Sequence, residues 1–210
     1  MKLHTFGPAA NGRRVAVFLA EKGLEIETSE LNVREGAQYE EPFTTMNPFH
    51  CVPFLELDSG QVISESIAIC RYIEAKHPEP PLFGQTDEEK ADVEMWLRRI
   101  ELDAFIPLLH AVRNKAPMFE GRVLPGHRSD LPQLPEMTQR GVETASLFLD
   151  RTDPLLVGNE FIAGDAISIA DLIGALTMNT AVMVGMDLEG GWPNVHRWHQ
   201  AINARPSMQG

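Results

Sequence analysis

Three prolines within four positions divide this chain into two stretches with different hydrophobic patterns. They lie in the segment His77-Pro78-Glu79-Pro80-Pro81. Because proline has no backbone N–H and biases the preceding residue away from the helical conformation, neither a helix nor a central strand is expected to continue through it. Strand-like and helix-like patterns alternate before this segment, whereas only helical patterns follow it. We therefore predict two domains, over residues 1–77 and 87–210, joined by a linker over residues 78–86.

The first 77 residues have the pattern of a small α/β domain. Alternating or short apolar runs predict strands over residues 2–6, 25–31, 53–57 and 61–64. Helical spacing of apolar residues predicts helices over residues 12–22, with Gly23 as the stop, and over residues 66–76. The order is strand, helix, strand, irregular segment, hairpin and helix. This order predicts a mixed four-stranded sheet covered by helices.

Residues 87–210 are predicted to form an all-α domain. Apolar residues three and four positions apart predict helices over residues 87–115, 135–150, 172–184 and 193–204, and residues 118–134 are rich in Gly and Pro and predict a loop. Pro107 lies within the first helix and is expected to kink it. Ser168 and Asp171 form a capping-box pattern, with Asp at the position where Glu is commoner.

The charge balance argues against two classes of partner. The chain has 18 Lys and Arg against 30 Asp and Glu, a formal net charge of −12, which disfavours nucleic acid and anionic membrane surfaces. A hydrophobic fraction of 43% is enough for a packed core. Two cysteines are too few for a disulfide framework, and no apolar run approaches the roughly 20 residues of a membrane-spanning helix. We therefore expect a cytoplasmic protein.

Two segments of the first domain and one of the second resemble a known family. They read Asn-Pro-Phe-His-Cys-Val-Pro-Phe-Leu over residues 47–55, Ser-Glu-Ser-Ile-Ala-Ile over residues 64–69, and Gly-Asp-x-x-Ser-x-x-Asp over residues 164–171. Together they are similar to the cytosolic glutathione S-transferase family, in an order that extends over nearly the whole chain. The resemblance implies a thioredoxin-like N-terminal domain, of βαβ-ββα order, followed by an all-α helical bundle.

The resemblance also implies a binding site for glutathione as a co-substrate. In the family the peptide bond before the residue equivalent to Pro53 is cis, which would turn the N–H and C=O of Val52 toward an extended tripeptide. Ser66 would receive a carboxylate at a helix N-terminus. Glu65 would accept from the α-ammonium of the ligand, and His50 would meet the glycine carboxylate.

Structural interpretations of these residues remain open at this stage. Pro53 can simply begin a strand, Ser66 can cap its own helix, and His50 can be a surface loop residue. Cys51 and Cys70 are expected to be small buried apolar side chains rather than nucleophiles.

The residue that would activate the thiol departs from the common pattern of the family. Relatives carry Tyr, Ser or Cys after the first strand, but residues 6–14 read Phe-Gly-Pro-Ala-Ala-Asn-Gly-Arg-Arg. Asn11 resembles an Asn of a bacterial branch that contacts the glutathione sulfur, and Arg13 and Arg14 add positive charge. Lowering a thiol pKa by two units takes about 2.7 kcal/mol, comparable to one hydrogen bond to a charged group at about 1.5–3 kcal/mol. Asn11 is therefore the candidate catalytic residue, with a plain helix N-cap as the alternative.

A second branch of the family also lacks the hydroxyl. Residues 86–96 resemble this branch, in which polar groups of the C-terminal domain hold a water near the sulfur. His110, Arg113 and Asn114 lie in the corresponding region of this chain.

These observations predict a transferase that joins the glutathione thiolate to a small electrophile, with a role in detoxification. Glutathione-dependent reduction of a disulfide or peroxide is an alternative, as is a glutathione-binding protein without catalysis. The resemblance implies a homodimer, and no metal ligand set is expected. The acceptor substrate stays open, with Phe6, Pro8, His110 and Met118 as candidates for its pocket by position.

Overall fold

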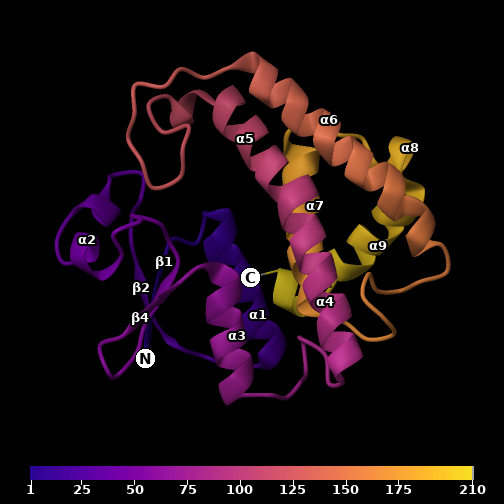
Figure 1. The fold of residues 1–210 in the computed structure, drawn as a ribbon, viewed down its shortest axis with the longest axis horizontal. Coiled ribbons are helices and arrows are strands. Elements are labelled where there is room, and N and C mark those ends of the chain that lie inside the picture. The colour runs from indigo at the N-terminus through magenta and orange to yellow at the C-terminus, as the bar shows by residue number, and fades with distance from the viewer. Residues whose placement is uncertain (210) are drawn as a thin grey trace. The chain divides into compact units, whose positions relative to one another are not determined.

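The computed structural model describes residues 1–209, which fall into two compact units (Figure 1). Unit 1 consists of Met1–Pro80 together with the short segment Pro125–His127. Unit 2 consists of Pro81–Leu124 and the chain from Arg128 onward. The linker over residues 78–86 stays a prediction.

Unit 1 is built on a mixed sheet with the strand order β2-β1-β3-β4. Strand β1 runs parallel to β2, with Lys2 opposite Glu27, and antiparallel to β3, with Leu3 opposite Leu55. Strands β3 and β4 form an antiparallel hairpin. The mixed four-stranded sheet predicted from the alternating pattern is confirmed. Its strands are β1 (Lys2–Thr5), β2 (Glu27–Glu30), β3 (Phe54–Glu56) and β4 (Val62–Ser64).

Two helices of unit 1, α1 (Ala10–Lys22) and α3 (Ser66–Lys76), lie on the same side of this sheet (Figure 1). Their apolar side chains, among them Phe18 and Ile73, are fully buried. Helix α1 ends where predicted, because Gly23 takes the left-handed conformation with φ of 64°. The irregular segment before β3 contains a 3-10 turn, η1 (Ala37–Tyr39), and a short helix, α2 (Phe43–Met46). Both are too short to produce a periodic pattern.

Charged side chains are buried in unit 1. The Lys22 side chain is fully buried, forms an ion pair with Glu74 of α3, and donates to the carbonyl oxygens of His77 at 2.8 Å and Pro80 at 2.5 Å. Arg14 is only 2% exposed. The expectation that Arg14 helps to attract an anionic ligand is therefore wrong, because its position in α1 faces the interior of the unit rather than solvent.

Among residues 81–209, unit 2 consists of helices and the loops between them, with no strand, as predicted. Its first helical stretch runs through α4 (Asp87–Arg99), a π-helical segment η2 (Ile100–Phe105) and α5 (Ile106–Lys115). Pro107 has no N–H to donate to the carbonyl of Asp103, and its ring crowds that carbonyl, so the distortion lies just before the proline. The other α-helices of the unit are α6 (Pro135–Thr152), α7 (Ile169–Met183), α8 (Leu188–Gly191) and α9 (Pro193–Asn203).

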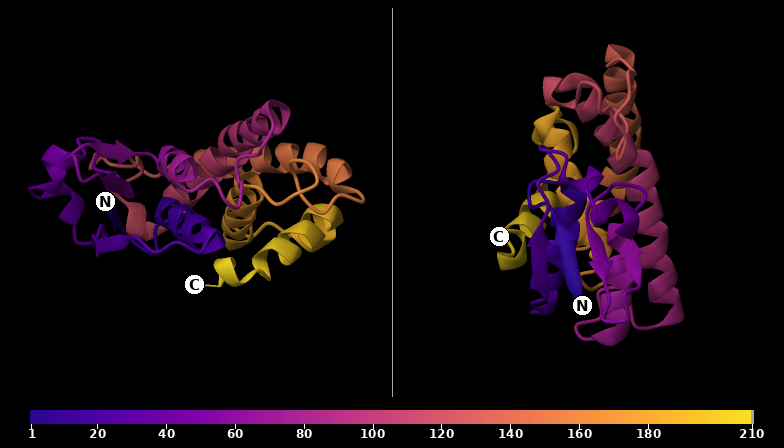
Figure 2. Two further views of the ribbon diagram at one scale, coloured as in Figure 1. Left: turned by 90° about the horizontal axis from the view of Figure 1, so that it is seen from below. Right: turned by 90° about the vertical axis from the view of Figure 1, so that its left-hand side faces the viewer.

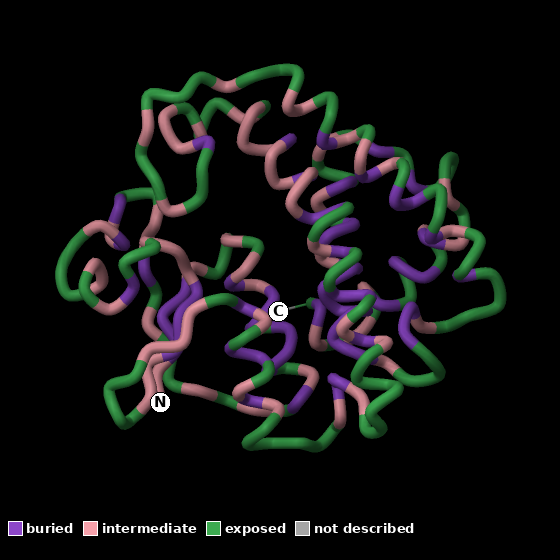
Figure 3. The backbone as a smooth tube through the Cα atoms, in the orientation of Figure 1, coloured by how far each residue is buried: buried purple, intermediate pink, exposed green. Residues whose placement is uncertain are grey.

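Helix α7 is the central helix of unit 2. Most of its residues are buried, as Figure 3 shows in purple, and α9 in yellow lies alongside it in Figure 2. Asp171 in its first turn is fully buried and accepts hydrogen bonds from the backbone N–H of Ser168 at 3.0 Å and of Ile162 at 2.7 Å. It also accepts from the Ser168 hydroxyl at 2.9 Å and from Nε1 of Trp198 at 2.9 Å. The predicted pairing of Ser168 with Asp171 is confirmed.

Short 3-10 turns complete unit 2. They are η3 (Pro117–Phe119), η4 (Asp153–Leu156) and η5 (Pro206–Met208). Within residues 1–209, no helix has the length and apolar character needed to cross a membrane.

Candidate functional site

Two non-glycine residues of unit 1 have a backbone in the left-handed conformation, which is usually adopted by glycine. His50 has φ of 50° and Glu65 has φ of 72°, and they are the only non-glycine residues with positive φ among those the structure describes. This conformation is unfavourable for L-residues and persists where the surrounding structure enforces it, commonly at functional sites. Both residues lie in the segments that the sequence assigns to glutathione, and the β3–β4 hairpin joins these segments.

The turn that carries His50 is held by the side chain of Asn47. This side chain donates from Nδ2 to the carbonyl of Cys51 at 2.8 Å and accepts at Oδ1 from the N–H of Phe49 at 3.3 Å. The N–H of His50 donates to the carbonyl of Asn47 at 2.9 Å, and the His50 ring lies 5.1 Å from that of Tyr39. Asn47 therefore positions His50. The sequence shows it as an Asn-Pro turn signal, but not which groups it bonds.

Val52 presents an unpaired stretch of backbone. Within the described chain, its N–H and C=O form no hydrogen bond, and the residue is half-buried. The peptide bond between Val52 and Pro53 is cis. Pro53 is buried, and β3 begins at Phe54 directly after it. An extended peptide can therefore pair with the main chain of Val52.

Ser66 is the first residue of α3, and Glu65 is its N-cap residue. Because Glu65 and not Ser66 occupies the N-cap position, the interpretation of Ser66 as the cap of its own helix is wrong. Ser66 is 4% exposed. The N–H groups of the first helical turn have no partner in the helix and favour an anion. A ligand carboxylate at this terminus can accept hydrogen bonds from these N–H groups.

Asn11 lies at the second position of α1, whose N-cap residue is Ala9. The interpretation of Asn11 as a helix N-cap is therefore wrong. Within residues 1–209, its Oδ1 atom is buried without a hydrogen-bond partner, as is Oγ1 of Thr5 at the end of β1. Gly12 allows these two elements to meet, because a Cβ there would lie 2.6 Å from Oγ1 of Thr5 and 2.7 Å from the carbonyl of Phe6.

Buried polar atoms in proteins are nearly always hydrogen-bonded, so these atoms of Asn11 and Thr5 are open to a polar group from outside the chain, such as a water molecule or a ligand. Thr5 is a residue that the sequence analysis missed. The feature of the sequence that could have identified it is a hydroxyl side chain at the last position of the first strand.

The two cysteines differ in their surroundings. Cys70 is fully buried in α3, as expected, and burial raises the pKa of its thiol. Cys51 is half-buried, contrary to the expectation of a buried side chain, because it belongs to the surface turn before Val52. No cluster of His, Cys, Asp and Glu suited to a metal ion occurs among residues 1–209.

The polar residues near the end of α5 hold the loop that follows. Asn114 donates from Nδ2 to the carbonyl of His110 at 2.9 Å and accepts at Oδ1 from the N–H of Leu134 at 2.9 Å. The Arg113 guanidinium donates to the carbonyl of Arg122 and lies over the ring of Phe119 at 4.8 Å. These two side chains therefore have structural partners inside unit 2.

Comparison with known proteins places the chain in a family. The family model described as the N-terminal domain of glutathione S-transferase matches residues 10–76, and the model of the C-terminal domain matches residues 112–206. Glutathione S-transferase F10 of Arabidopsis thaliana is 34% identical over 178 residues, which cover 82% of this chain and 77% of the relative. The chain belongs to the glutathione S-transferase family.

Solved structures of this family agree with the fold. A glutathione S-transferase of class Gtt2 from Vibrio parahaemolyticus is 32% identical, with a TM-score of 0.84 over 100% of this chain and 96% of the other. Gtt2 from Saccharomyces cerevisiae is 27% identical, with a TM-score of 0.88 over 100% and 99% of the two chains. Both solved structures therefore have the same fold as this chain.

Proposed function

We propose that this family member is a cytoplasmic enzyme that conjugates the thiolate of glutathione, its co-substrate, to a small electrophile. The observation that carries the proposal is the side-chain amide of Asn11 at the start of α1, whose buried Oδ1 has no hydrogen-bond partner within residues 1–209. The donor and the acceptor of the amide exchange places when it turns by 180°, so Nδ2 can take this buried position and donate to a thiolate, the group whose stabilisation this family's chemistry requires. Membership of the family supports glutathione as that ligand.

In the proposed complex, each part of the tripeptide meets a group of matching chemistry. The unpaired backbone of Val52, next to Pro53, pairs with the extended cysteinyl segment. The γ-glutamyl carboxylate binds at the N-terminus of α3 with Ser66, and Glu65 accepts from the α-ammonium. His50 meets the glycine carboxylate. The strained φ values of His50 and Glu65 fit a site whose geometry is set before the ligand arrives.

Asn11 acts on the ionisation of the thiol in this proposal. Its Nδ2 donates to the sulfur, and the N-terminus of α1 adds the positive end of a helix dipole. A thiol with a pKa of about 8.5 is only about 3% ionised at pH 7, and lowering the pKa by two units makes it about three quarters ionised. The required 2.7 kcal/mol or so is within the range of one or two hydrogen bonds to a charged group.

The test replaces the amide. We expect Asn11→Ala to lower kcat/KM for an activated aryl chloride by about tenfold to a hundredfold, or about 1.4–2.8 kcal/mol. The acidic limb of the pH–rate profile should move upward by about one to two pH units, because the bound thiol regains its ordinary pKa. The matched control is Asn159→Ala, which removes an exposed amide of unit 2 and should leave both quantities unchanged. An unshifted pH profile in Asn11→Ala would contradict the assigned role.

Reduction of a disulfide or peroxide by two glutathione molecules is the second candidate, and it uses the same Asn11. The products separate the two reactions, since conjugation yields a thioether and reduction yields oxidised glutathione. Saturable glutathione binding with no turnover of either substrate class would instead indicate a binding protein.

A further inference from the structure

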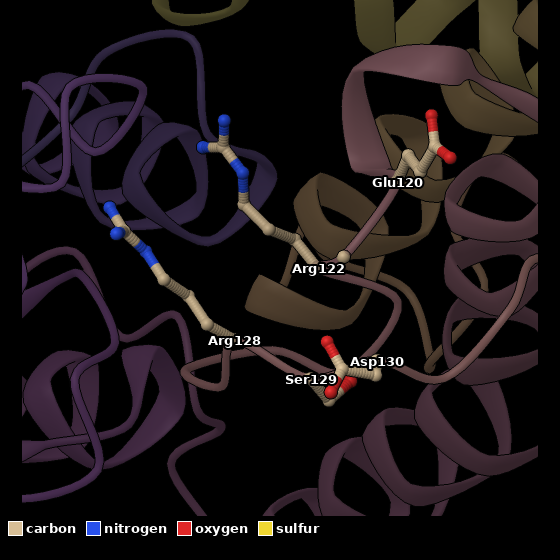
Figure 4. A pocket seen from close by; sticks show the side chains of 6 residues that line it. Glu120, Arg122, Arg128, Ser129 and Asp130 are labelled. Carbon is tan, nitrogen blue, oxygen red and sulfur yellow. The ribbon is translucent and has the colours of Figure 1, made fainter.

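The loop between α5 and α6 has a tip of three residues, Pro125–His127, that belongs to unit 1, whereas the chain before and after the tip belongs to unit 2. The two arms of the loop carry Arg122 and Arg128, which line a cavity of unit 2 (Figure 4). The N–H of Ser129 donates to the carbonyl of Gly121 at 3.0 Å and joins the two arms. The tip is therefore held at its base, and its own contacts are with unit 1.

Gly126, in the middle of the tip, lies directly against the turn that carries His50. A Cβ at Gly126 would overlap the carbonyl oxygen of Phe49 and lie 2.9 Å from Sγ of Cys51. Gly126 also has φ of 70°, a conformation that L side chains rarely adopt. The close approach and the backbone conformation both require glycine here. The residue therefore contacts the chain immediately before and immediately after His50.

The turn that carries His50 depends on support of this kind. The φ of 50° at His50 is unfavourable for an L-residue and persists only where neighbouring groups enforce it. The Phe49 side chain is exposed, so it does not anchor the turn in the core. Instead the side chain of Asn47 bonds the backbone of Phe49 and Cys51, and Gly126 packs on the same two residues from a segment far along the chain. These two supports fix the backbone on both sides of His50.

We infer that Gly126 is a positioning residue for the glycine end of glutathione and acts through His50. The inference rests on the proposed function, in which His50 meets the glycine carboxylate. A hydrogen bond to a carboxylate is strong only within narrow limits of distance and angle. A side chain at Gly126 would displace the Phe49 carbonyl and shift the turn, and this contact would weaken. The sulfur and the γ-glutamyl group would keep their contacts, because other segments supply them.

Calorimetric titration with two ligands tests the inference. One ligand is glutathione, and the other is glutathione amide, in which a neutral carboxamide replaces the glycine carboxylate. We expect the wild-type protein to bind glutathione at least about tenfold more tightly than the amide, because the amide lacks the charge. Gly126→Ala should reduce this preference to less than about threefold by weakening the binding of glutathione. It should change the affinity for the amide by less than about twofold.

A matched control separates the contact from backbone strain. Gly158 has φ of 76°, and apart from its own neighbours in the chain no described residue comes within 4 Å of a Cβ placed there. Gly158→Ala therefore introduces the same kind of strain without the contact, and it should keep the wild-type preference.

Two readouts distinguish positioning from a general loss of structure. The double variant Gly126→Ala/His50→Ala should show the same preference as His50→Ala alone, because both changes remove one contact. In Gly126→Ala the KM for glutathione should rise by about threefold to tenfold. Its kcat at saturating glutathione and the acidic limb of its pH–rate profile should stay as in the wild type.

A milder variant keeps the test decisive if Gly126→Ala does not fold. Pro125 is exposed, and Pro125→Gly frees the backbone of the tip without an overlap, so the preference should fall by about twofold to threefold. The inference alone is overturned if glutathione binds and the folded tip variants keep the full preference, or if Gly158→Ala loses as much of it. Absence of glutathione binding in the wild-type protein would overturn the proposed function as well.

Discussion

The accessibility of its thiol distinguishes Cys51 from Cys70. Cys70 is fully buried in α3, and burial raises its pKa, so the nucleophilic thiolate is scarce and shielded. Cys51 is half-buried in the turn held by Asn47. Cys51 is therefore the more exposed of the two cysteines, and the one that we expect a reagent to reach in the folded protein.

We predict that a thiol reagent titrates one cysteine in the native protein and two after denaturation. The Cys51→Ser variant should titrate none in the native state, while Cys70→Ser should titrate one. Because the proposed chemistry uses the thiol of glutathione, Cys51→Ser should keep kcat/KM within about twofold of wild type. A loss of activity in Cys51→Ser would instead show that the protein's own thiol takes part.

At the scale of elements, α7 and α9 are joined by a buried polar contact. His199 Nε2 lies 2.7 Å from Oδ1 of Asn179 and 2.7 Å from Nδ2 of Asn203. Its other ring nitrogen, Nδ1, is buried without a partner in the described chain. Desolvation, and to a lesser extent the charge of His196, lowers the pKa of His199 from 6.5 to about 4. The folded protein therefore holds this imidazole neutral.

This contact predicts a loss of stability at mildly acidic pH. Since the unfolded chain binds the proton near pH 6.5 and the folded chain only near pH 4, the stabilisation is complete above the first value and is lost as the pH falls toward the second. Chemical denaturation should show a decrease of about 1–2 kcal/mol between pH 7 and pH 5. His199→Gln should flatten this decrease, whereas His127→Gln, at an exposed position, should retain it. Equal pH dependence in both variants would contradict the assignment to His199.

For the whole molecule, net charge opposes self-association. Each chain carries −12, so two copies repel one another, and the repulsion reaches further when salt is removed. Several large apolar side chains are exposed, among them Phe49 with an exposed fraction of 70% and Met183 with 71%. Such side chains can form apolar contacts between two copies, and the strength of these contacts does not depend on charge screening by salt.

We expect a homodimer whose dissociation constant rises as salt is lowered from about 0.15 M to about 0.01 M, where the screening length grows from about 8 Å to about 30 Å. Sedimentation equilibrium measures this directly against the chain mass of 23.4 kDa. A particle of a single chain's mass at every concentration would contradict the dimer. A dimer that weakens as salt rises would indicate an interface of paired opposite charges instead.

Local patterns were enough for much of this molecule. The alternation of residues 2–64 and the Ser168–Asp171 pattern are set by backbone sterics and nearest neighbours, and each predicted its element. They could not show that Asp171 also accepts from Ile162 and Trp198, which lie 9 and 27 positions away along the chain. The pattern of charge was less informative about which side chains are exposed. Arg13 and Arg14 form one basic pair in the sequence, but Arg14 is buried.

The sequence by itself determined the two-part architecture, the family and the segments that carry His50, Glu65 and Ser66, because those features depend on residues close together in the chain. Only the tertiary structure decided that the Asn11 oxygen is buried and, within residues 1–209, has no hydrogen-bond partner. Burial and pairing depend on which distant groups the fold brings within reach, and no local pattern records that.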